Sequence, residues 1–272
     1  FEGIKKLPPA HLLRVGERGI EQPQRYWHFP APSPRAPSPQ EAIEQVAVTL
    51  REAVASALVA DVPVGAYLSG GVDSSLIVAL MSDLRQGSGV KTFSAGFGDP
   101  RYDELPYARQ VSQLLGTEHH EVAVTPDDFR NLWRRLTWHR DAPISEPADI
   151  AVFRLAEIAR RSVTVVLSGE GSDELFGGYP KHRYAQASSI AGMLPAPLRS
   201  AALGAIERRL PASAGRLRIA LRALTGRDEA SRFRGWFSPF TAAERQALLK
   251  DSARHPEAGW LQEPEGDPLR RM

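Results

Sequence analysis

The chain has 272 residues, of which 42% are hydrophobic and 24% are charged, a composition typical of a globular protein with a sizeable core. The near balance of 34 basic and 32 acidic residues argues against nucleic acid as the main partner, because phosphate backbones are bound by clustered positive charge. The absence of cysteine excludes disulfides and thiol nucleophiles. No apolar run approaches the roughly 20 residues that span a bilayer, so we expect a cytoplasmic protein without a membrane partner.

The first 40 residues predict a change of structure within the chain. Residues 1–29 contain short extended segments, with His11–Val15 as a candidate strand. Residues 30–39 are so rich in proline that we expect a stiff linker there. A helix follows, for which Ser38 is a suitable N-cap and Glu41 completes a capping box.

Beyond the linker, apolar strands alternate with helices. We expect strands over residues 62–68, 90–97, 119–124 and 163–167, and helices over residues 74–84, 107–115, 125–136 and 150–158. This alternation predicts an α/β fold with a mostly parallel sheet flanked by helices. Ligands of such sheets bind beyond the carboxyl ends of the strands. Residues 189–272 are helical in character but are interrupted by prolines.

The loop after the first of these strands is suited to binding an anion. In Ser69–Ser75, the adjacent Gly70 and Gly71 allow close approach of the backbone, and the following helix start adds its N–H groups and dipole. A carboxylate such as that of Asp73 is expected in an anion-binding loop if the anion is a phosphate group that binds together with a magnesium ion. The alternative is an ordinary glycine turn in which Asp73 and Ser74 cap the helix.

A second loop, residues 168–179, follows the last strand. Its carboxylates Glu170, Asp173 and Glu174 lie within five residues and repel one another unless a cation or a basic substrate balances them. The alternative is a polar turn whose acids cap the next helix.

Both loops resemble known motifs. Ser69-Gly70-Gly71-Val72-Asp73-Ser74 is similar to the pyrophosphate-binding loop of the ATP pyrophosphatase superfamily, which includes asparagine, GMP, NAD and argininosuccinate synthetases. It is not a kinase-type phosphate loop, and residues 87–92, the nearest candidate for one, lack a glycine directly before the lysine. Residues 168–179 resemble the second motif of the glutamine-hydrolysing asparagine synthetases.

The resemblance implies an adenine nucleotide alpha hydrolase-like fold and a role for each matching residue. Tyr67 and Ala95 meet adenine through their backbone, Ser168 and Gly169 contact the nucleotide, and Ser69, Gly70, Gly71 and Ser74 bind pyrophosphate. Asp73 and Asp173 face pyrophosphate and Mg²⁺, and Glu170 serves the reacting centre.

The implied reaction joins aspartate to ATP as β-aspartyl-AMP, which ammonia from a glutaminase domain then converts to asparagine. Residues 1–29 resemble the end of that preceding glutaminase domain, and residues 40–272 resemble a synthetase domain truncated at its C-terminus. Because the rest of the glutaminase half and a later lysine have no match here, we do not expect the isolated chain to show the full activity.

Two other functions stay open on the sequence alone. One is a different amide-forming, adenylating ligase on the same scaffold, acting in peptide or antibiotic biosynthesis, and the other is a non-catalytic ATP-binding module. The oligomeric state stays open as well, a homodimer included. The adjacent His119 and His120 are not expected to hold one metal ion, because neighbouring side chains of a strand point to opposite faces.

Overall fold

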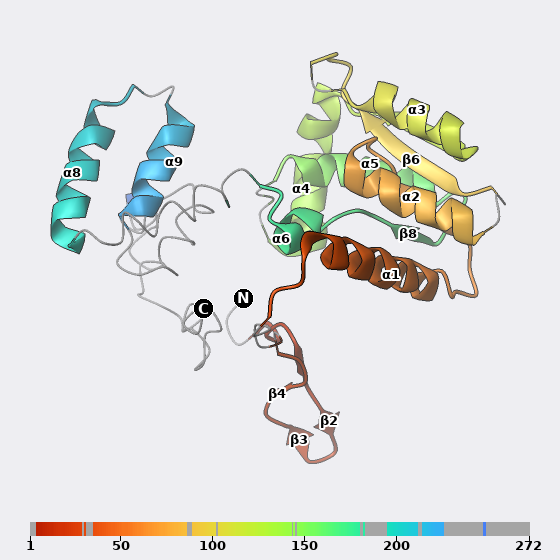
Figure 1. The fold of residues 1–272 in the computed structure, drawn as a ribbon, viewed down its shortest axis with the longest axis horizontal. Helices are drawn as coiled ribbons and strands as arrows, with labels where there is room; N and C mark the ends of the chain where they lie inside the picture. The colour runs from red at the N-terminus through yellow and green to blue at the C-terminus, as the bar shows by residue number, and fades with distance from the viewer. Residues whose placement is uncertain are drawn as a thin grey trace. The chain divides into compact units, whose positions relative to one another are not determined.

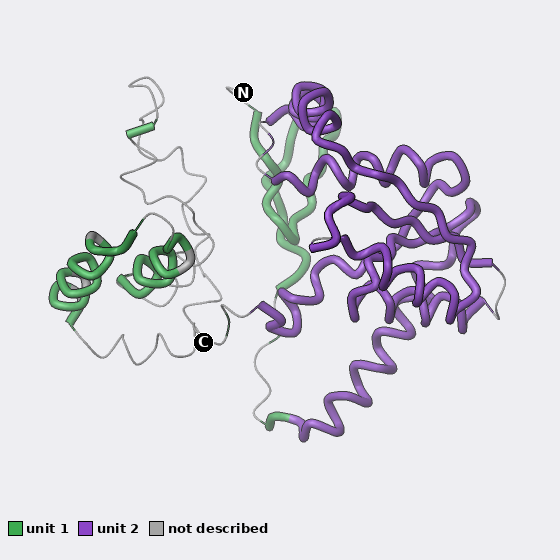
Figure 2. Tube along the Cα trace, turned by 90° about the horizontal axis from the view of Figure 1, so that it is seen from above, with its two compact units in different colours: residues 1–36, 180–272 green, residues 37–179 purple. Residues whose placement is uncertain are grey.

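A computed structural model describes residues 4–28, 30, 35–85, 89–101, 103–142, 144, 146–179, 182, 195–211, 214–225 and 247–248. The chain divides into two compact units, which are coloured in Figure 2. Residues 37–179 form one unit, and residues 1–36 and 180–272 form the other. The boundary near residue 36 falls inside the predicted linker, and both predicted loops belong to the unit formed by residues 37–179.

Four parallel strands form the sheet of this unit (Figure 1). They are β5 (Val64–Tyr67), β6 (Lys91–Gly96), β7 (Glu118–Ala123) and β8 (Val165–Leu167), in the order β7-β6-β5-β8. The predicted α/β fold class is confirmed. β5 begins later than predicted, directly after Pro63, whose nitrogen carries no hydrogen for a strand ladder.

Among the described residues of this unit, six helices precede, connect or follow these strands. They are α1 (Pro39–Ala57), α2 (Val72–Leu84), α3 (Leu105–Leu115), α4 (Pro126–Arg140), α5 (Ala148–Ala159) and α6 (Ser172–Phe176). Two capping boxes start α1 and α4: Ser38 with Glu41, as predicted, and Thr125 with Asp128.

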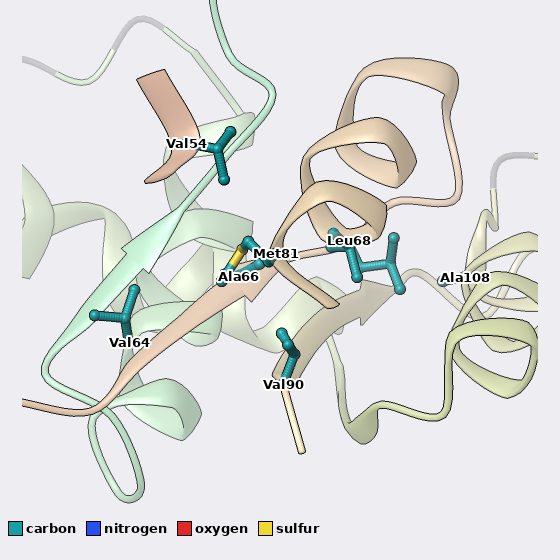
Figure 3. Close-up of a cluster of buried hydrophobic side chains, with 8 residues drawn as sticks. Val54, Val64, Ala66, Leu68, Met81, Val90 and Ala108 are labelled. Carbon is teal, nitrogen blue, oxygen red and sulfur yellow. The ribbon is translucent and has the colours of Figure 1, made fainter. Parts of the chain in front are cut away.

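The core of the unit lies on both faces of the sheet. On one face, Val64, Ala66 and Leu68 pack with Val54 of α1 and Met81 of α2, and Ala108 of α3 belongs to the same cluster (Figure 3). On the other face, side chains of α4 and α5 cover β6, β7 and β8. Successive residues of a strand point to opposite faces, so Tyr67, next to Leu68, packs on the α5 side. The sheet therefore lies between two helical layers.

In the other unit, the described residues form two short two-stranded sheets and a pair of helices. β1 (His11–Leu12) pairs with β4 (Gln24–Arg25), and β2 (Val15–Gly16) pairs with β3 (Gly19–Ile20), all antiparallel. The predicted single strand His11–Val15 is therefore wrong, because the chain changes partner after Leu12. Gly19 begins β3 after the hairpin turn at φ +104°, a conformation open to glycine.

The expected helical character of the C-terminal part is confirmed over α8 (Ala196–Arg209) and α9 (Gly215–Leu224), which an ion pair between Glu207 and Arg222 at 2.6 Å joins. Most of the remaining predicted helical tail lies outside the described residues. Within the described part of the chain, no helix is long and apolar enough to cross a membrane.

Candidate functional site

The two predicted loops meet at the carboxyl ends of β5 and β8. These strands are neighbours, so the chain leaves both at the same edge of the sheet. Contact between the loops is backbone to backbone: a Cβ atom on Gly169 would lie 2.8 Å from the nitrogen of Ser74 and 2.9 Å from the carbonyl carbon of Asp73. Only a residue without a side chain fits at this crossing, so Gly169 brings the loops together.

A cavity of about 370 Å³ opens between the loops. Most predicted site residues line it, namely Tyr67, Ser69, Asp73, Ser74, Ala95, Ser168, Gly169, Glu170 and Asp173. Gly70 and Gly71 are not among its lining residues and instead shape the loop behind it. The structure thus gathers residues that are about a hundred positions apart in the sequence.

Hydroxyl groups hold the first loop in its turn. The Oγ atoms of Ser69 and Ser74 lie 2.9 Å apart, and the backbone nitrogen of Ser69 donates to the Ser74 Oγ at 3.2 Å. The nitrogen of Gly71 donates to the Ser69 Oγ at 3.2 Å. Gly71 is also the N-cap of α2 and has no side chain with which to cap the helix. The loop therefore presents the first turn of α2, with its unpaired N–H groups and positive dipole end, to the cavity edge.

Gly70 fixes the loop against α3. Its φ of +83° is in the left-handed region, and a Cβ would lie 2.5 Å from the nitrogen of Ala108 and 2.6 Å from the carbonyl carbon of Tyr107. The position thus excludes a side chain both by its backbone conformation and by its surroundings.

The second loop turns into the single-turn helix α6. Gly171, at φ +95°, is its N-cap, and the Ser172 hydroxyl donates to the Gly169 carbonyl at 2.9 Å. The phenol of Tyr179 donates to Oε1 of Glu174 at 2.7 Å, and this bond to a carboxylate raises the pKa of Tyr179 to about 12. The segment that follows α6 thus contacts a carboxylate of that helix.

The charged side chains among the described residues that line the cavity are all acidic. Five carboxylates contribute, those of Asp73, Glu104, Glu170, Asp173 and Glu174, and none of the described lining residues is basic. Such a wall repels an anionic ligand unless cations accompany that ligand or come from elsewhere. The described residues also contain no group of three or more His, Asp or Glu side chains placed to hold a metal ion unaided.

Another part of the lining is apolar. Phe93, Phe97 and Leu155 contribute to it together with the aromatic ring of Tyr67, whose pKa burial raises. Such apolar side chains suit contact with a planar apolar group. Sequence reasoning missed the α5 contribution, Ala151, Val152 and Leu155, because these residue types also occur in any packed helix.

The two adjacent histidines lie outside the cavity lining. Nδ1 of His119 lies 2.9 Å from the Thr92 hydroxyl, whereas the His120 ring stacks on Phe93 with centroids 5.3 Å apart. The two rings thus contact neighbouring residues of β6 that point to opposite faces of the sheet. Burial is the main cause that lowers the pKa of His119.

Comparison with known proteins decides the family. The family model described as asparagine synthase matches residues 45–272, most of the chain, including both loops. This chain belongs to the asparagine synthase family. Its resemblance to the glutamine-hydrolysing asparagine synthetases, inferred from the two loops, is thereby confirmed.

Three curated proteins are similar to this chain. The chain is 38% identical over 174 residues to a Methanocaldococcus jannaschii protein whose name assigns it provisionally to the glutamine-hydrolyzing asparagine synthetases, covering 64% of this chain and 33% of the relative. It is 34% identical over 180 residues to asparagine synthetase (glutamine-hydrolyzing) 1 of Bacillus subtilis, covering 66% and 28%. It is 35% identical over 202 residues to amidase chyE of Penicillium rubens, covering 67% and 30%. The chain thus spans about a third or less of the length of these relatives.

Proposed function

We propose that this chain is the ATP-dependent synthetase part of a glutamine-hydrolysing asparagine synthetase. The observation that supports this function best is the convergence of the two family loops on one cavity. The cavity has an apolar wall suited to a purine base, a helix N-terminus suited to phosphates and an acidic wall that requires a cation.

In this proposal the nucleotide binds between the two loops. Its base packs in the apolar part, in which Tyr67 and Ala95 line the ends of β5 and β6. The pyrophosphate end binds at the start of α2, where N–H groups and the Ser69 and Ser74 hydroxyls are available as donors. The Ser168–Gly169 segment contacts the nucleotide from the side of β8.

The acidic residues fit a magnesium ion bound together with the phosphates. Magnesium prefers a few carboxylates completed by phosphate and water oxygens, and Asp73 and Asp173 both line the cavity. This arrangement agrees with the lack, among the described residues, of a cluster that could hold an ion unaided. We propose these two residues as the protein ligands. When bound, such an ion neutralises charge that develops on the pyrophosphate leaving group.

The proposed chemistry has two steps. The side-chain carboxylate of aspartate attacks the α-phosphorus of ATP, so that an acyl–phosphate bond forms and the bond to pyrophosphate breaks. Ammonia, delivered from a glutaminase domain, then attacks the acyl carbon and AMP departs. Glu170, an exposed carboxylate on the cavity wall, acts on the second step, either by accepting a proton from the ammonium centre or by orienting the attack.

A second candidate function is amide formation on another carboxylate. The relative named amidase chyE, 35% identical to this chain, favours keeping it open, because its name is not that of an asparagine synthetase. A non-catalytic ATP-binding module has less support, since nucleotide binding alone does not require Glu170.

The test is aspartate-dependent exchange of labelled pyrophosphate into ATP with magnesium, on this chain and on a longer protein that contains it joined to a glutaminase domain. We expect exchange in the longer protein and its loss in Asp73→Ala, since adenylate formation is reversible. ATP binding without exchange for aspartate, but with exchange for another carboxylate, would transfer the assignment to the second candidate. ATP binding without exchange for any carboxylate would favour the binding module.

A further inference from the structure

The turn after α6 folds back over the acidic residues of the second loop. α6 ends at Phe176, and its C-cap Gly177, with a φ of +67°, reverses the chain. The backbone nitrogen of Gly178 then donates to the carbonyl oxygen of Asp173 at 3.0 Å. The next residue, Tyr179, reaches the neighbouring carboxylate of Glu174. Both acids of α6 are thus contacted by the residues that follow the helix.

Gly178 leaves room for the Asp173 side chain. A Cβ atom at position 178 would lie 2.0 Å from Oδ1 of Asp173, 3.1 Å from its Cγ and 3.3 Å from its Cα. Two non-bonded heavy atoms cannot approach to 2.0 Å. The carboxylate of Asp173 therefore occupies the volume that the side chain of any other residue at 178 would fill.

We propose that Gly178 is a positioning residue for Asp173: its missing side chain lets the Asp173 carboxylate lie in the orientation in which it lines the cavity. The inference rests on the proposed function, in which Asp173 binds the cation that accompanies ATP. It adds a residue outside the cavity lining to those that decide cation binding, and it explains why a glycine follows the chain-reversing Gly177.

An alanine at position 178 should change cation binding without preventing folding, because the clash involves only the flexible end of the Asp173 side chain. Gly178 does not adopt a positive φ, so an alanine there meets no backbone strain of the left-handed kind. The atom met at 2.0 Å is the end of the Asp173 side chain, which can rotate about its χ1 bond. We therefore expect Gly178→Ala to fold normally and to turn the Asp173 carboxylate away from its present position.

The experiment is a double-mutant cycle read out by Mn²⁺ binding, with Mn²⁺ as a paramagnetic substitute for magnesium. Free Mn²⁺ is measured by electron paramagnetic resonance as it is titrated into the chain in the presence of a non-hydrolysable ATP analogue. The proteins are the unmodified chain, Gly178→Ala, Asp173→Ala and the double variant. Gly116→Ala is the control, because Gly116 has a φ of +63° and no atom within 4 Å of its Cβ position, so it reports generic backbone strain.

The proposal predicts that Gly178→Ala weakens Mn²⁺ binding roughly 10- to 100-fold, the range typical for residues that orient a metal ligand. In the Asp173→Ala background the same substitution should change the affinity less than about two-fold, because non-additivity marks residues that act through one another. Gly116→Ala should leave the affinity unchanged while lowering the thermal midpoint.

Two results would overturn the positioning role: unchanged Mn²⁺ affinity in Gly178→Ala, or an equal loss with and without the Asp173 carboxylate. In either case, Mn²⁺ binding to the unmodified chain in the presence of the ATP analogue would still agree with the proposed function. Absence of Mn²⁺ binding to the unmodified chain with the ATP analogue would instead refute the proposed cation site, and the positioning role with it.

Discussion

Gly169→Ala tests whether the site depends on the close crossing of its two loops. The added methyl group would lie 2.8 Å from the Ser74 nitrogen, whereas ordinary contact begins at 3.4 Å. Both nearest atoms, on Ser74 and Asp73, belong to the backbone, which the start of α2 holds in place. No side-chain rotation relieves this contact, so one loop must move away from the other.

The expected magnitude follows from the cost of overpacking. Forcing a methyl group into a closely packed contact destabilises a protein by about 1–3 kcal/mol. In a domain of this size each kcal/mol lowers the thermal midpoint by roughly 2–4 °C, so a decrease of about 4–8 °C corresponds to the middle of the range. Because the moved loop carries Ser168 and Glu170, we also expect the affinity for an ATP analogue to fall about ten-fold, equivalent to about 1.4 kcal/mol.

Differential scanning calorimetry measures the first effect, and isothermal titration with the analogue measures the second. Gly71→Ala is the matched control in the same site: its Cβ would meet only the Ser69 hydroxyl, at 3.3 Å, and its φ of −69° suits any residue. We expect the free energy of unfolding of that variant to stay within about 1 kcal/mol of that of the unmodified protein. Equal thermal midpoints for Gly169→Ala and Gly71→Ala, or an unchanged affinity for the analogue in Gly169→Ala, would refute the reasoning.

Three further predictions concern single contacts. The pKa of Tyr179 is raised from 10.0 to about 12, so its hydrogen bond to Glu174 stabilises the fold below pH 10 and is lost as the pH rises through 12. Thermal midpoints measured over an alkaline pH series should therefore decline more steeply in the unmodified chain than in Tyr179→Phe. Burial lowers the pKa of His119 in the folded state, so as the pH drops below about 6.5 the unfolded state binds a proton before the folded state does, and the fold loses stability. Thermal midpoints of His119→Gln should therefore decline less on the acid side than those of the unmodified chain. Ser38→Ala removes the side-chain half of the α1 capping box and should cost about 1 kcal/mol in urea unfolding, whereas Ser38→Asp, which retains a cap, should cost little.

Much of the site could be predicted from local sequence, because each loop follows a strand directly. An apolar run that ends in Ser69-Gly70-Gly71 or in Ser168-Gly169 places these residues at the carboxyl end of its strand, whatever the strand order. Helix starts were equally local, since Ser38 and its partner Glu41 are only three residues apart.

The remaining features depend on tertiary packing that the local sequence does not encode. Which strands are neighbours was not predictable, so the contact of Gly169 with Asp73 had no sequence signal. The same holds for the α5 residues of the cavity wall and for the space that Gly178 leaves for Asp173. A glycine in a motif indicates that a side chain is excluded there, but only the fold shows which atoms exclude it.

The strand order also has a consequence for synthesis on the ribosome. β5, β6 and β7 follow one another along the chain, yet the partner on the other side of β5 is β8, which is made about a hundred residues later. A nascent chain that ends before Val165 therefore exposes the hydrogen-bonding edge of β5, and such edges are prone to pair with other chains. Assembly of the cavity must be a late event in biogenesis, and premature termination between β7 and β8 should yield aggregation-prone products instead of partially active ones.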